Sequence, residues 1–282
     1  MLSRARKLRP ALALPVAATL LITIAAAPTA ASAAGTTDAT SAADDRQYVA
    51  LGDSYSSGVG APPYTDGDCK QSTHSYAAQF ARNNPRLSFG FSACSGATTD
   101  DVIAHQLGFL GPDTTLVTIT VGGDNLGFTT TLKTCIEALL DSTCEDAVNK
   151  ARAYIKTTLP GKLKQVYGDI LAAAPNAKLI VLGYPQLFAP SFCFEAPLDA
   201  NRRGWINHAA VQLNEAIGNT AKTYGAFAPV DDLFNKHRVC DDDPWLNGIT
   251  AIDDAFHPNL AGYTDGYLKA LDAVLHPVTA TH

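Results

Sequence analysis

Three short β-favouring runs, each closed by a glycine, constrain the fold of this 282-residue chain more than any other feature. They are Tyr48–Leu51, Thr114–Val121 and Ala177–Leu182. Short apolar runs rich in β-branched residues are typical of buried strands, and the glycines mark the turns that end them. Residues 86–94 and 227–231 add two further candidate strands.

Helical patterns lie between these runs. Residues 75–84 form a short amphipathic pattern, and residues 145–174 have helical periodicity in two pieces. Pro160 suits the first turn of the second piece, because proline lacks the N–H that a first turn leaves unbonded. Residues 199–224 and 260–275 predict two more helices. Strands that alternate with helices indicate a parallel sheet covered on both faces, with sites at the carboxyl ends of the strands.

The first 33 residues are typical of a secretory signal peptide. Four basic residues precede an apolar run, and Ala31-Ser-Ala33 suits a cleavage site. A membrane anchor is the alternative, but Pro15 interrupts the run and small residues end it. We expect residues 34–46 to be a disordered leader and residues 47–282 to form a single domain, although a mature chain of this size also fits two small ones.

The charge of the chain limits its partners. The formal net charge of −6 becomes −10 without the signal peptide, because that segment carries four basic residues and no acidic one. Nucleic-acid binding requires clustered Lys and Arg, so a strongly acidic exported chain is a poor candidate for it, and we expect no nucleic-acid partner. We expect a secreted, extracellular protein that does not insert stably into membranes and acts as a monomer.

An even number of cysteines in an exported chain indicates disulfides. Six cysteines allow fifteen pairings. Zinc is the alternative, but no Cys-x-x-Cys and no zinc spacing of histidines occurs. The cysteines are Cys69, Cys94, Cys135, Cys144, Cys193 and Cys240.

The acidic triplet Asp241-Asp-Asp243 fits a solvated loop. Calcium binding is the alternative, but the alternation of oxygen ligands expected of an EF-hand loop is absent.

A serine directly follows the first strand, in Gly52-Asp-Ser54. A hydroxyl is a poor nucleophile at neutral pH and needs a base. Asp254 and His257 can face the same way on a turn, so the carboxylate would orient one imidazole nitrogen while the other meets Ser54 Oγ. The alternative is that Gly-Asp-Ser is only a turn that ends the strand. The other histidines fit surface or helix positions: His74, His105, His208, His237, His276 and His282.

Four motifs in this order resemble those of the GDSL, or SGNH-hydrolase, family, especially its secreted actinobacterial lipases and esterases. The resemblance covers nearly all of the mature chain. Gly52-Asp-Ser54 resembles the nucleophile block, and Cys94-Ser-Gly96 resembles the second block, whose glycine N–H serves the oxyanion hole. Val121-Gly-Gly-Asp-Asn125 resembles the third block, and Asp254-Ala-Phe-His257 resembles the fifth, which holds the triad acid and base.

The resemblance implies a fold and a reaction. The fold would be a flavodoxin-like, three-layer α/β/α sandwich with a parallel sheet. The reaction would be carboxylic-ester hydrolysis through an acyl-enzyme, with Ser54, Asp254 and His257 as catalytic residues and with no metal or cofactor. The similar enzymes pair their cysteines in chain order, which implies Cys69–Cys94, Cys135–Cys144 and Cys193–Cys240.

The third block departs from the family pattern. The family reads Gly-x-Asn-Asp, with the asparagine amide as an oxyanion donor, whereas here Asp124 precedes Asn125. An ionised carboxylate would repel a developing oxyanion. We expect Asn125 to turn inward and to join the backbone N–H groups of Ser54 and Gly96. The alternative is a site that works with backbone donors alone.

The resemblance implies a small-molecule or lipid ester as the substrate. We expect medium to long acyl esters, including lipid; a phospholipase, a carbohydrate acetyl esterase and a non-catalytic binding module are the alternatives. A binding module normally lacks a catalytic residue, and none is missing here. Four residues near loop positions are candidates for an acyl pocket, although such residues are more often core: Leu126, Phe128, Phe188 and Phe192.

Overall fold

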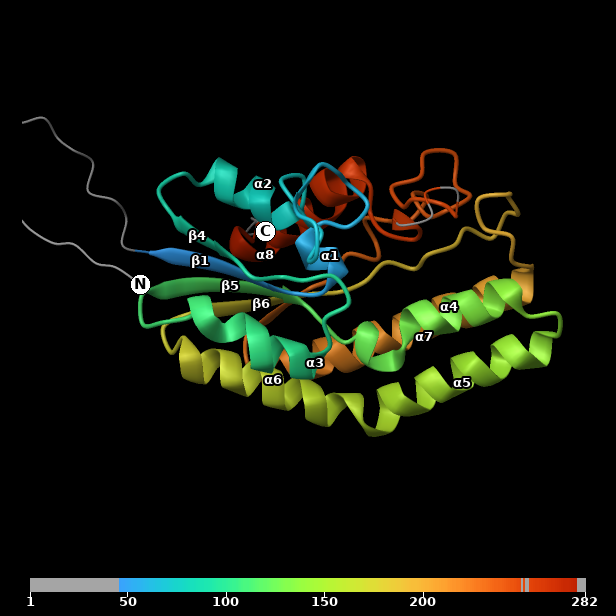
Figure 1. Ribbon diagram of the computed structural model, residues 1–282, viewed down its shortest axis with the longest axis horizontal. Coiled ribbons are helices and arrows are strands. Elements are labelled where there is room, and N and C mark those ends of the chain that lie inside the picture. The colour runs from blue at the N-terminus through green and yellow to red at the C-terminus, as the bar shows by residue number, and fades with distance from the viewer. Residues whose placement is uncertain (1–45, 250, 252–253, 278–282) are drawn as a thin grey trace, which may run out of the picture. The chain divides into compact units, whose positions relative to one another are not determined.

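The computed structural model of the chain describes residues 46–249, 251 and 254–277 (Figure 1). The segment that we assign to a signal peptide, residues 1–33, lies outside the described residues. The expected leader also lies outside them, apart from its last residue, Arg46.

Five parallel strands form the central sheet, in the order β4-β1-β5-β6-β7. Counted along the chain, this order is 2-1-3-4-5, which is that of flavodoxin-like folds. Each of the five predicted runs overlaps one of these strands. The strands are β1 (Gln47–Gly52), β4 (Ser88–Phe91), β5 (Thr114–Thr120), β6 (Lys178–Leu182) and β7 (Ala226–Ala228).

Helices cover both faces of the sheet and confirm the predicted three-layer sandwich (Figure 1). One face carries α2 (Tyr76–Asn83) and α8 (Lys269–Leu275). The other carries α6 (Leu159–Ala173) and α7 (Ala200–Ala221), and α5 (Asp141–Thr157) packs against α7. Within the described part of the chain, every helix is too short or too polar to cross a membrane.

The sequence patterns missed several short elements and one full helix. The helix is α4 (Phe128–Glu137), whose three consecutive threonines have low helix propensity and whose first residue follows a glycine without a side-chain cap. The predicted final helix begins as a π-helix before α8. The missed short elements are α1 (Ser54–Ser57), β2 (Tyr64–Asp66), β3 (Gln71–Ser72), and the helical turns η1 (Val102–Gln106), η2 (Leu107–Phe109) and η3 (Asp124–Leu126). The π-helix η5 (Gly262–Leu268) lies within the predicted final helix, and the short helix α3 (Thr99–Asp101) is capped by Thr98.

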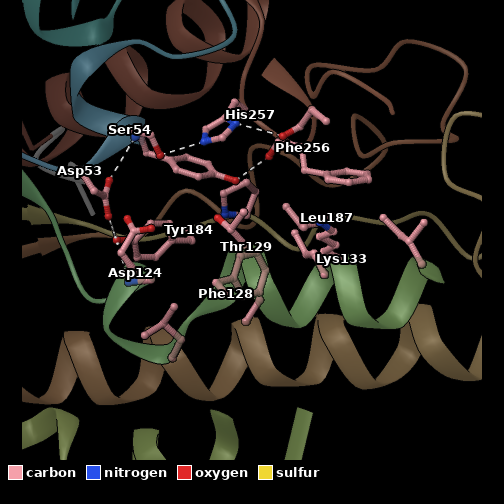
Figure 2. Close-up of a pocket in the computed structure, with 18 of the residues that line it drawn as sticks. Asp53, Ser54, Asp124, Phe128, Thr129, Lys133, Tyr184, Leu187, Phe256 and His257 are labelled. Carbon is pink, nitrogen blue, oxygen red and sulfur yellow. Dashed lines mark hydrogen bonds between the residues drawn. The ribbon is translucent and has the colours of Figure 1, made fainter. Parts of the chain in front are cut away.

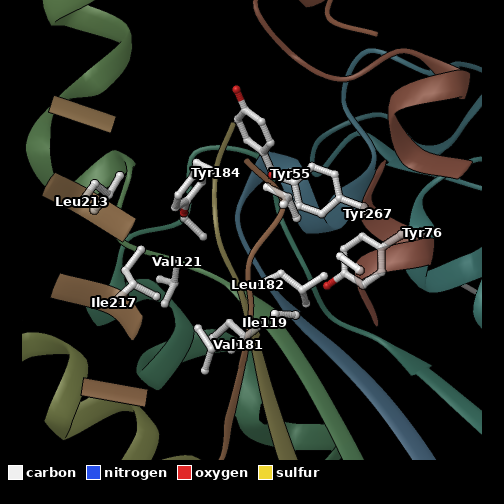
Figure 3. Close-up of a cluster of buried hydrophobic side chains, with 14 of the residues drawn as sticks. Tyr55, Tyr76, Ile119, Val121, Val181, Leu182, Tyr184, Leu213, Ile217 and Tyr267 are labelled. Carbon is white, nitrogen blue, oxygen red and sulfur yellow. The ribbon is translucent and has the colours of Figure 1, made fainter. Parts of the chain in front are cut away.

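Tyrosines form much of the core between the sheet and the α2/α8 layer, and Figure 3 shows several of them. A buried hydroxyl is costly unless it is hydrogen-bonded, and each of these finds a buried partner. Tyr48 bonds Thr118 Oγ1 (2.8 Å), Tyr76 bonds Ser56 Oγ (2.9 Å), Tyr263 bonds the Val59 carbonyl (2.8 Å) and Tyr267 bonds the Gly183 carbonyl (2.8 Å). These bonds tie the outer helices to the strands and to the turns that follow them.

Three disulfides crosslink the connections around the sheet. The pairs are Cys69–Cys94, Cys135–Cys144 and Cys193–Cys240, which are the pairings that the resemblance implies. All six cysteines lie outside the five strands of the sheet. The first disulfide joins the loop between β2 and β3 to the segment just before Gly96, where Ser95 N–H also donates to the Cys69 carbonyl at 3.0 Å.

Candidate active site

Ser54 is placed by the sharp turn that ends β1. Gly52 has a φ of +118°, and a side chain there would overlap the Thr120 carbonyl oxygen of β5, so the turn requires glycine. Asp53 then caps α1, because its carboxylate accepts a hydrogen bond from the Tyr55 N–H at 3.1 Å. Ser54 is the first residue of α1 and lines a cavity at the carboxyl edge of the sheet.

His257 reaches the same point from the opposite end of the chain (Figure 2). Its Nε2 lies 2.8 Å from Ser54 Oγ, and its Nδ1 lies 3.0 Å from the Ala255 carbonyl oxygen. A carbonyl can only accept, so Nδ1 carries the proton and Nε2 is left to accept from the serine hydroxyl. The Tyr55 hydroxyl donates to the Phe256 carbonyl at 2.6 Å and holds this loop against α1.

The surroundings keep the imidazole uncharged. Burial lowers the pKa of His257 to about 4, and the Ala255 carbonyl and the charge of Asp254 oppose this shift only in part. A neutral imidazole beside a serine hydroxyl is the arrangement that general-base catalysis requires.

Asp254 does not make the hydrogen bond to His257 that the sequence analysis expects. Its Oδ1 accepts from the Tyr64 hydroxyl at 2.7 Å and lies 3.5 Å from Lys70 Nζ. The chain turns tightly here, with the His257 N–H donating to the Asp254 carbonyl at 3.2 Å, and this turn brings the nearer Ala255 carbonyl to the imidazole. Asp254 therefore acts on the ring through its charge, which raises the pKa of His257 against the larger, opposite effect of burial.

A cavity of about 380 Å³ extends from Ser54 and His257 between α4 and the segment that follows β6 (Figure 2). Of the four acyl-pocket candidates, Phe128 lines this cavity. The other three do not: Phe188 is fully buried core, Leu126 is half-buried, and Phe192 is exposed. Most of the lining is apolar and includes Phe128, Leu132, Ile136, Leu187, Leu213 and Phe256.

Two backbone groups near Ser54 are suited to an oxyanion. Gly96 has a φ of +80° and lies in an exposed turn, which the bond from the Cys94 N–H to the Gly52 carbonyl (2.9 Å) holds beside the start of α1. Among the described residues, no group accepts from the N–H of Ser54 or Gly96. Gly96 does not itself line the cavity.

Asn125 faces away from the cavity, contrary to the sequence prediction. Its Oδ1 accepts from the Thr99 N–H at 3.0 Å, and its Nδ2 donates to Thr99 Oγ1 at 2.9 Å. Asp124 lines the cavity with Ser54 instead. Successive side chains on a 3₁₀ turn diverge by about 120°, so two neighbours in η3 cannot face one site.

Two carboxyl groups share this end of the cavity. Burial raises the pKa of Asp53, and the charge of Asp124 raises it further. Burial also raises the pKa of Asp124, with the charge of Asp101 as the second cause. Both shifts favour a protonated carboxyl next to the nucleophile.

Several residues that shape the site carry no motif. Tyr184 immediately follows Gly183, which ends the β6 run, and its hydroxyl donates to Asp53 Oδ2, so the rule that places sites at the ends of strands could have found it. Tyr64 and Lys70 lie in a hairpin with no chemical signature. Ala255 contributes only a carbonyl, which no side-chain pattern can reveal.

The acidic triplet at 241–243 has local protein partners. Asp241 Oδ2 accepts from the Arg238 N–H at 2.8 Å, and the Asp243 carbonyl lies 2.8 Å from His237 Nδ1. In the part of the chain that the structure describes, no group of three or more His, Cys, Asp or Glu side chains could hold a metal ion.

Known proteins share this architecture. The sequence profile of the GDSL-like Lipase/Acylhydrolase family matches residues 50–264. A Streptomyces rimosus protein named "Lipase" is 42% identical over 261 residues, which span 91% of this chain and 96% of that protein. The crystal structure of an extracellular lipase from Streptomyces rimosus matches with a TM-score of 0.78 and 42% identity, over 81% of this chain and 99% of that chain. Phospholipase A1 from Streptomyces albidoflavus NA297 matches with a TM-score of 0.78 and 41% identity, over 81% and 98%. The chain belongs to the GDSL-like lipase/acylhydrolase family and is a carboxylic ester hydrolase.

Proposed function

We propose that the protein hydrolyses lipid acyl esters through a covalent acyl-enzyme on Ser54. The observation that carries this proposal is the 2.8 Å contact between His257 Nε2 and Ser54 Oγ at one end of an apolar cavity. A nucleophile paired with its base needs only donors for the oxyanion and a place for the acyl chain.

His257 is the general base of the first step. It takes the proton of the Ser54 hydroxyl as Oγ attacks the ester carbonyl, and the Ala255 carbonyl holds the resulting imidazolium through Nδ1–H. The backbone N–H groups of Ser54 and Gly96 donate to the oxyanion. Collapse of the tetrahedral intermediate transfers the proton from His257 to the leaving alcohol, and water then repeats the sequence on the acyl-enzyme.

The cavity selects the acyl group. Aliphatic and aromatic side chains from α4 and from the loop before His257 line it, and such a surface favours a hydrocarbon chain over a sugar. The names of the relatives, which include a lipase and an extracellular lipase, support the same substrate class.

Phospholipid is the second candidate substrate. The specific observation in its favour is the phospholipase A1 of Streptomyces albidoflavus NA297, which matches this chain as well as the lipase structure does. Both substrates present the same acyl ester to Ser54, so they differ only in the alcohol that leaves.

We also propose that the protein acts outside the cell as a monomer. The signal-peptide pattern of residues 1–33 and the three disulfides support export, because disulfides persist in oxidising compartments. The relative of known structure from Streptomyces rimosus is an extracellular lipase, which supports the same location.

A hydrolysis panel tests the substrate. It should run from short acyl esters through long-chain triglyceride and phospholipid to acetylated sugars, with and without a chelator. We expect medium and long acyl esters to be hydrolysed in both conditions. Activity confined to acetylated sugars would contradict the proposed substrate class.

Covalent labelling tests the mechanism. A fluorophosphonate should modify the wild-type protein on Ser54 and should not modify a folded Ser54→Ala variant. Equal labelling of both proteins, or unchanged turnover by Ser54→Ala, would rule out the acyl-enzyme route.

A further inference from the structure

We propose that Asp124 is a catalytic residue that works as a protonated carboxylic acid and donates a hydrogen bond to the oxyanion of the substrate. This inference rests on the ester hydrolysis proposed above and adds a third donor to its oxyanion hole. The family pattern has an asparagine amide at this position, and both an amide N–H and a protonated carboxyl O–H can donate a hydrogen bond to an oxyanion.

The turn after β5 places Asp124 on the wall of the cavity that Ser54 and His257 also line. Gly122, with a φ of +122°, ends the strand, and Asp124 opens η3 two residues later. Figure 2 shows the Asp124 side chain pointing toward the part of the cavity that holds Asp53 and Ser54. Both hydrogen bonds of the Asn125 amide to Thr99 fix the rotation of this turn.

The hydrogen bonds around the two carboxyl groups decide which one keeps the proton. Asp53 accepts from the Tyr55 N–H (3.1 Å), from the Thr120 hydroxyl (2.7 Å) and from the Tyr184 hydroxyl. Among the described residues, none donates a hydrogen bond to the Asp124 carboxyl. Donors stabilise the ionised form, and two neighbouring buried carboxyls resist double ionisation. The negative charge therefore stays on Asp53, and the proton stays on Asp124.

The charged groups around Asp124 act in the same direction. Burial is the main cause that raises the pKa of Asp124, and the charge of Asp101 in α3 raises it further. Asp53, at the start of α1, is coupled to Asp124, so a negative charge on either carboxyl disfavours ionisation of the other. On α4, Lys133 is the one Lys or Arg among the described residues that line the cavity, and its Nζ lies 3.9 Å from Glu137 Oε1. Helix α5 also packs against η3, but none of its described side chains lines the cavity. His257 on the facing loop is neutral.

The role of Asp124 requires no proton transfer. As Ser54 Oγ bonds to the carbonyl carbon, the carbonyl oxygen gains negative charge, and the Asp124 O–H donates to it while keeping its proton. Apolar protein surroundings can hold a carboxylic acid neutral for this purpose. An ionised Asp124 would repel the oxyanion, so kcat should fall as the pH rises through the pKa of Asp124. Protonation of His257 limits the rate on the acidic side, and the profile is a bell displaced toward acid.

The test is the pH profile of kcat and KM for the wild type, Asp124→Asn and Asp124→Ala. Asparagine donates at every pH, so Asp124→Asn should lose the alkaline decline and should exceed the wild type at alkaline pH by about tenfold or more. Asp124→Ala should have about a hundredfold lower kcat at the acidic optimum, with little change in KM, as is typical of a lost oxyanion donor. The control is Asp100→Asn, which removes an exposed carboxylate paired with Lys162 (2.8 Å) and should leave the profile unchanged.

Two results would overturn the proposal. The first is an Asp124→Asn profile that keeps the alkaline decline of the wild type. The second is a direct ¹³C titration of the Asp124 carboxyl in Ser54→Ala, assigned by its loss in Ser54→Ala/Asp124→Asn, that finds it ionised at the pH optimum. This titration does not depend on turnover. An inactive wild type that no fluorophosphonate labels would instead refute the proposed function.

Discussion

Two turns at the carboxyl edge of the sheet are built alike and differ in one respect. The turn after β1 and the turn after β5 each begin with a left-handed glycine, at φ +118° and +122°, and each sends an aspartate into the cavity. Asp53 in the first accepts three hydrogen bonds, whereas Asp124 in the second accepts none from a described residue. The hydrogen-bond donors around Asp53 therefore make its carboxylate part of the fold, whereas the Asp124 carboxyl has no such role. The first turn is fixed in place, and the second keeps a carboxyl available to substrate.

The largest effect should come from Ser54, which the first turn places, and from its base His257. We expect His257→Ala and Ser54→Ala each to fold normally and to lose kcat by about four orders of magnitude or more, because they remove the base and the nucleophile. Steady-state kinetics with far-UV circular dichroism as the folding control would measure this. A loss of kcat no larger than the hundredfold expected for Asp124→Ala would mean that the residues of the two turns contribute equally to catalysis.

Replacing Gly52 or Gly122 by alanine should destabilise the fold to different degrees. Both positions have positive φ, but a side chain at Gly52 overlaps the Thr120 backbone, while at Gly122 the nearest atom is Leu159 Cδ1 at 3.6 Å. We expect Gly52→Ala to lower the free energy of unfolding by more than about 3 kcal/mol and Gly122→Ala by about 1 to 2 kcal/mol. Denaturant unfolding monitored by circular dichroism gives both values. Equal losses would mean that φ alone governs both sites.

The two aspartates should differ in stability as well. Asp53→Ala removes the cap of α1, removes the acceptor of the buried Tyr184 hydroxyl and leaves the Thr120 hydroxyl with Ser56 Oγ (2.8 Å) as its partner, so we expect a loss of about 2 to 3 kcal/mol. Asp124→Ala breaks no hydrogen bond to a described residue and should cost less than about 1 kcal/mol. If the ranking reverses in denaturant unfolding, the assignment of the charge to Asp53 fails.

The smallest change is expected at Asp254, which lies outside both turns. Because Ala255 holds Nδ1 of the imidazole, Asp254→Ala should lower kcat by about tenfold or less. The effect is electrostatic, so Asp254→Asn should lower kcat to a similar degree. A loss close to that of His257→Ala would restore Asp254 to the triad role that the sequence analysis expects.

Local patterns predicted the sheet and the reacting pair well. Each of the five strands overlaps a predicted run because strand and helix periodicity is a property of neighbouring residues. The contact between Ser54 and His257 spans most of the chain, yet each residue sits in a motif that the sequence alone displays. Helix α4 was not predicted, because it is stabilised by packing on α5 and its threonine-rich sequence has low helix propensity.

The mistaken expectations share a physical cause. Whether Asp124 or Asn125 faces the cavity depends on the rotation of η3, which Thr99 fixes from another part of the chain. The orientation of Asp254 likewise depends on Tyr64, which lies 190 positions earlier. Motifs identify which residues gather at a site, but distant partners decide where each side chain points.

The buried tyrosines of the core also set how the protein responds to alkali. Burial raises the pKa of Tyr76 to about 12 and raises the pKa values of Tyr48, Tyr263 and Tyr267 well above the ordinary value. The folded state keeps these protons above about pH 10, where an unfolded chain releases them, so stability falls as the pH rises through this range. The ultraviolet absorbance of tyrosinate should therefore appear together with loss of the fold, as one cooperative step instead of a gradual titration.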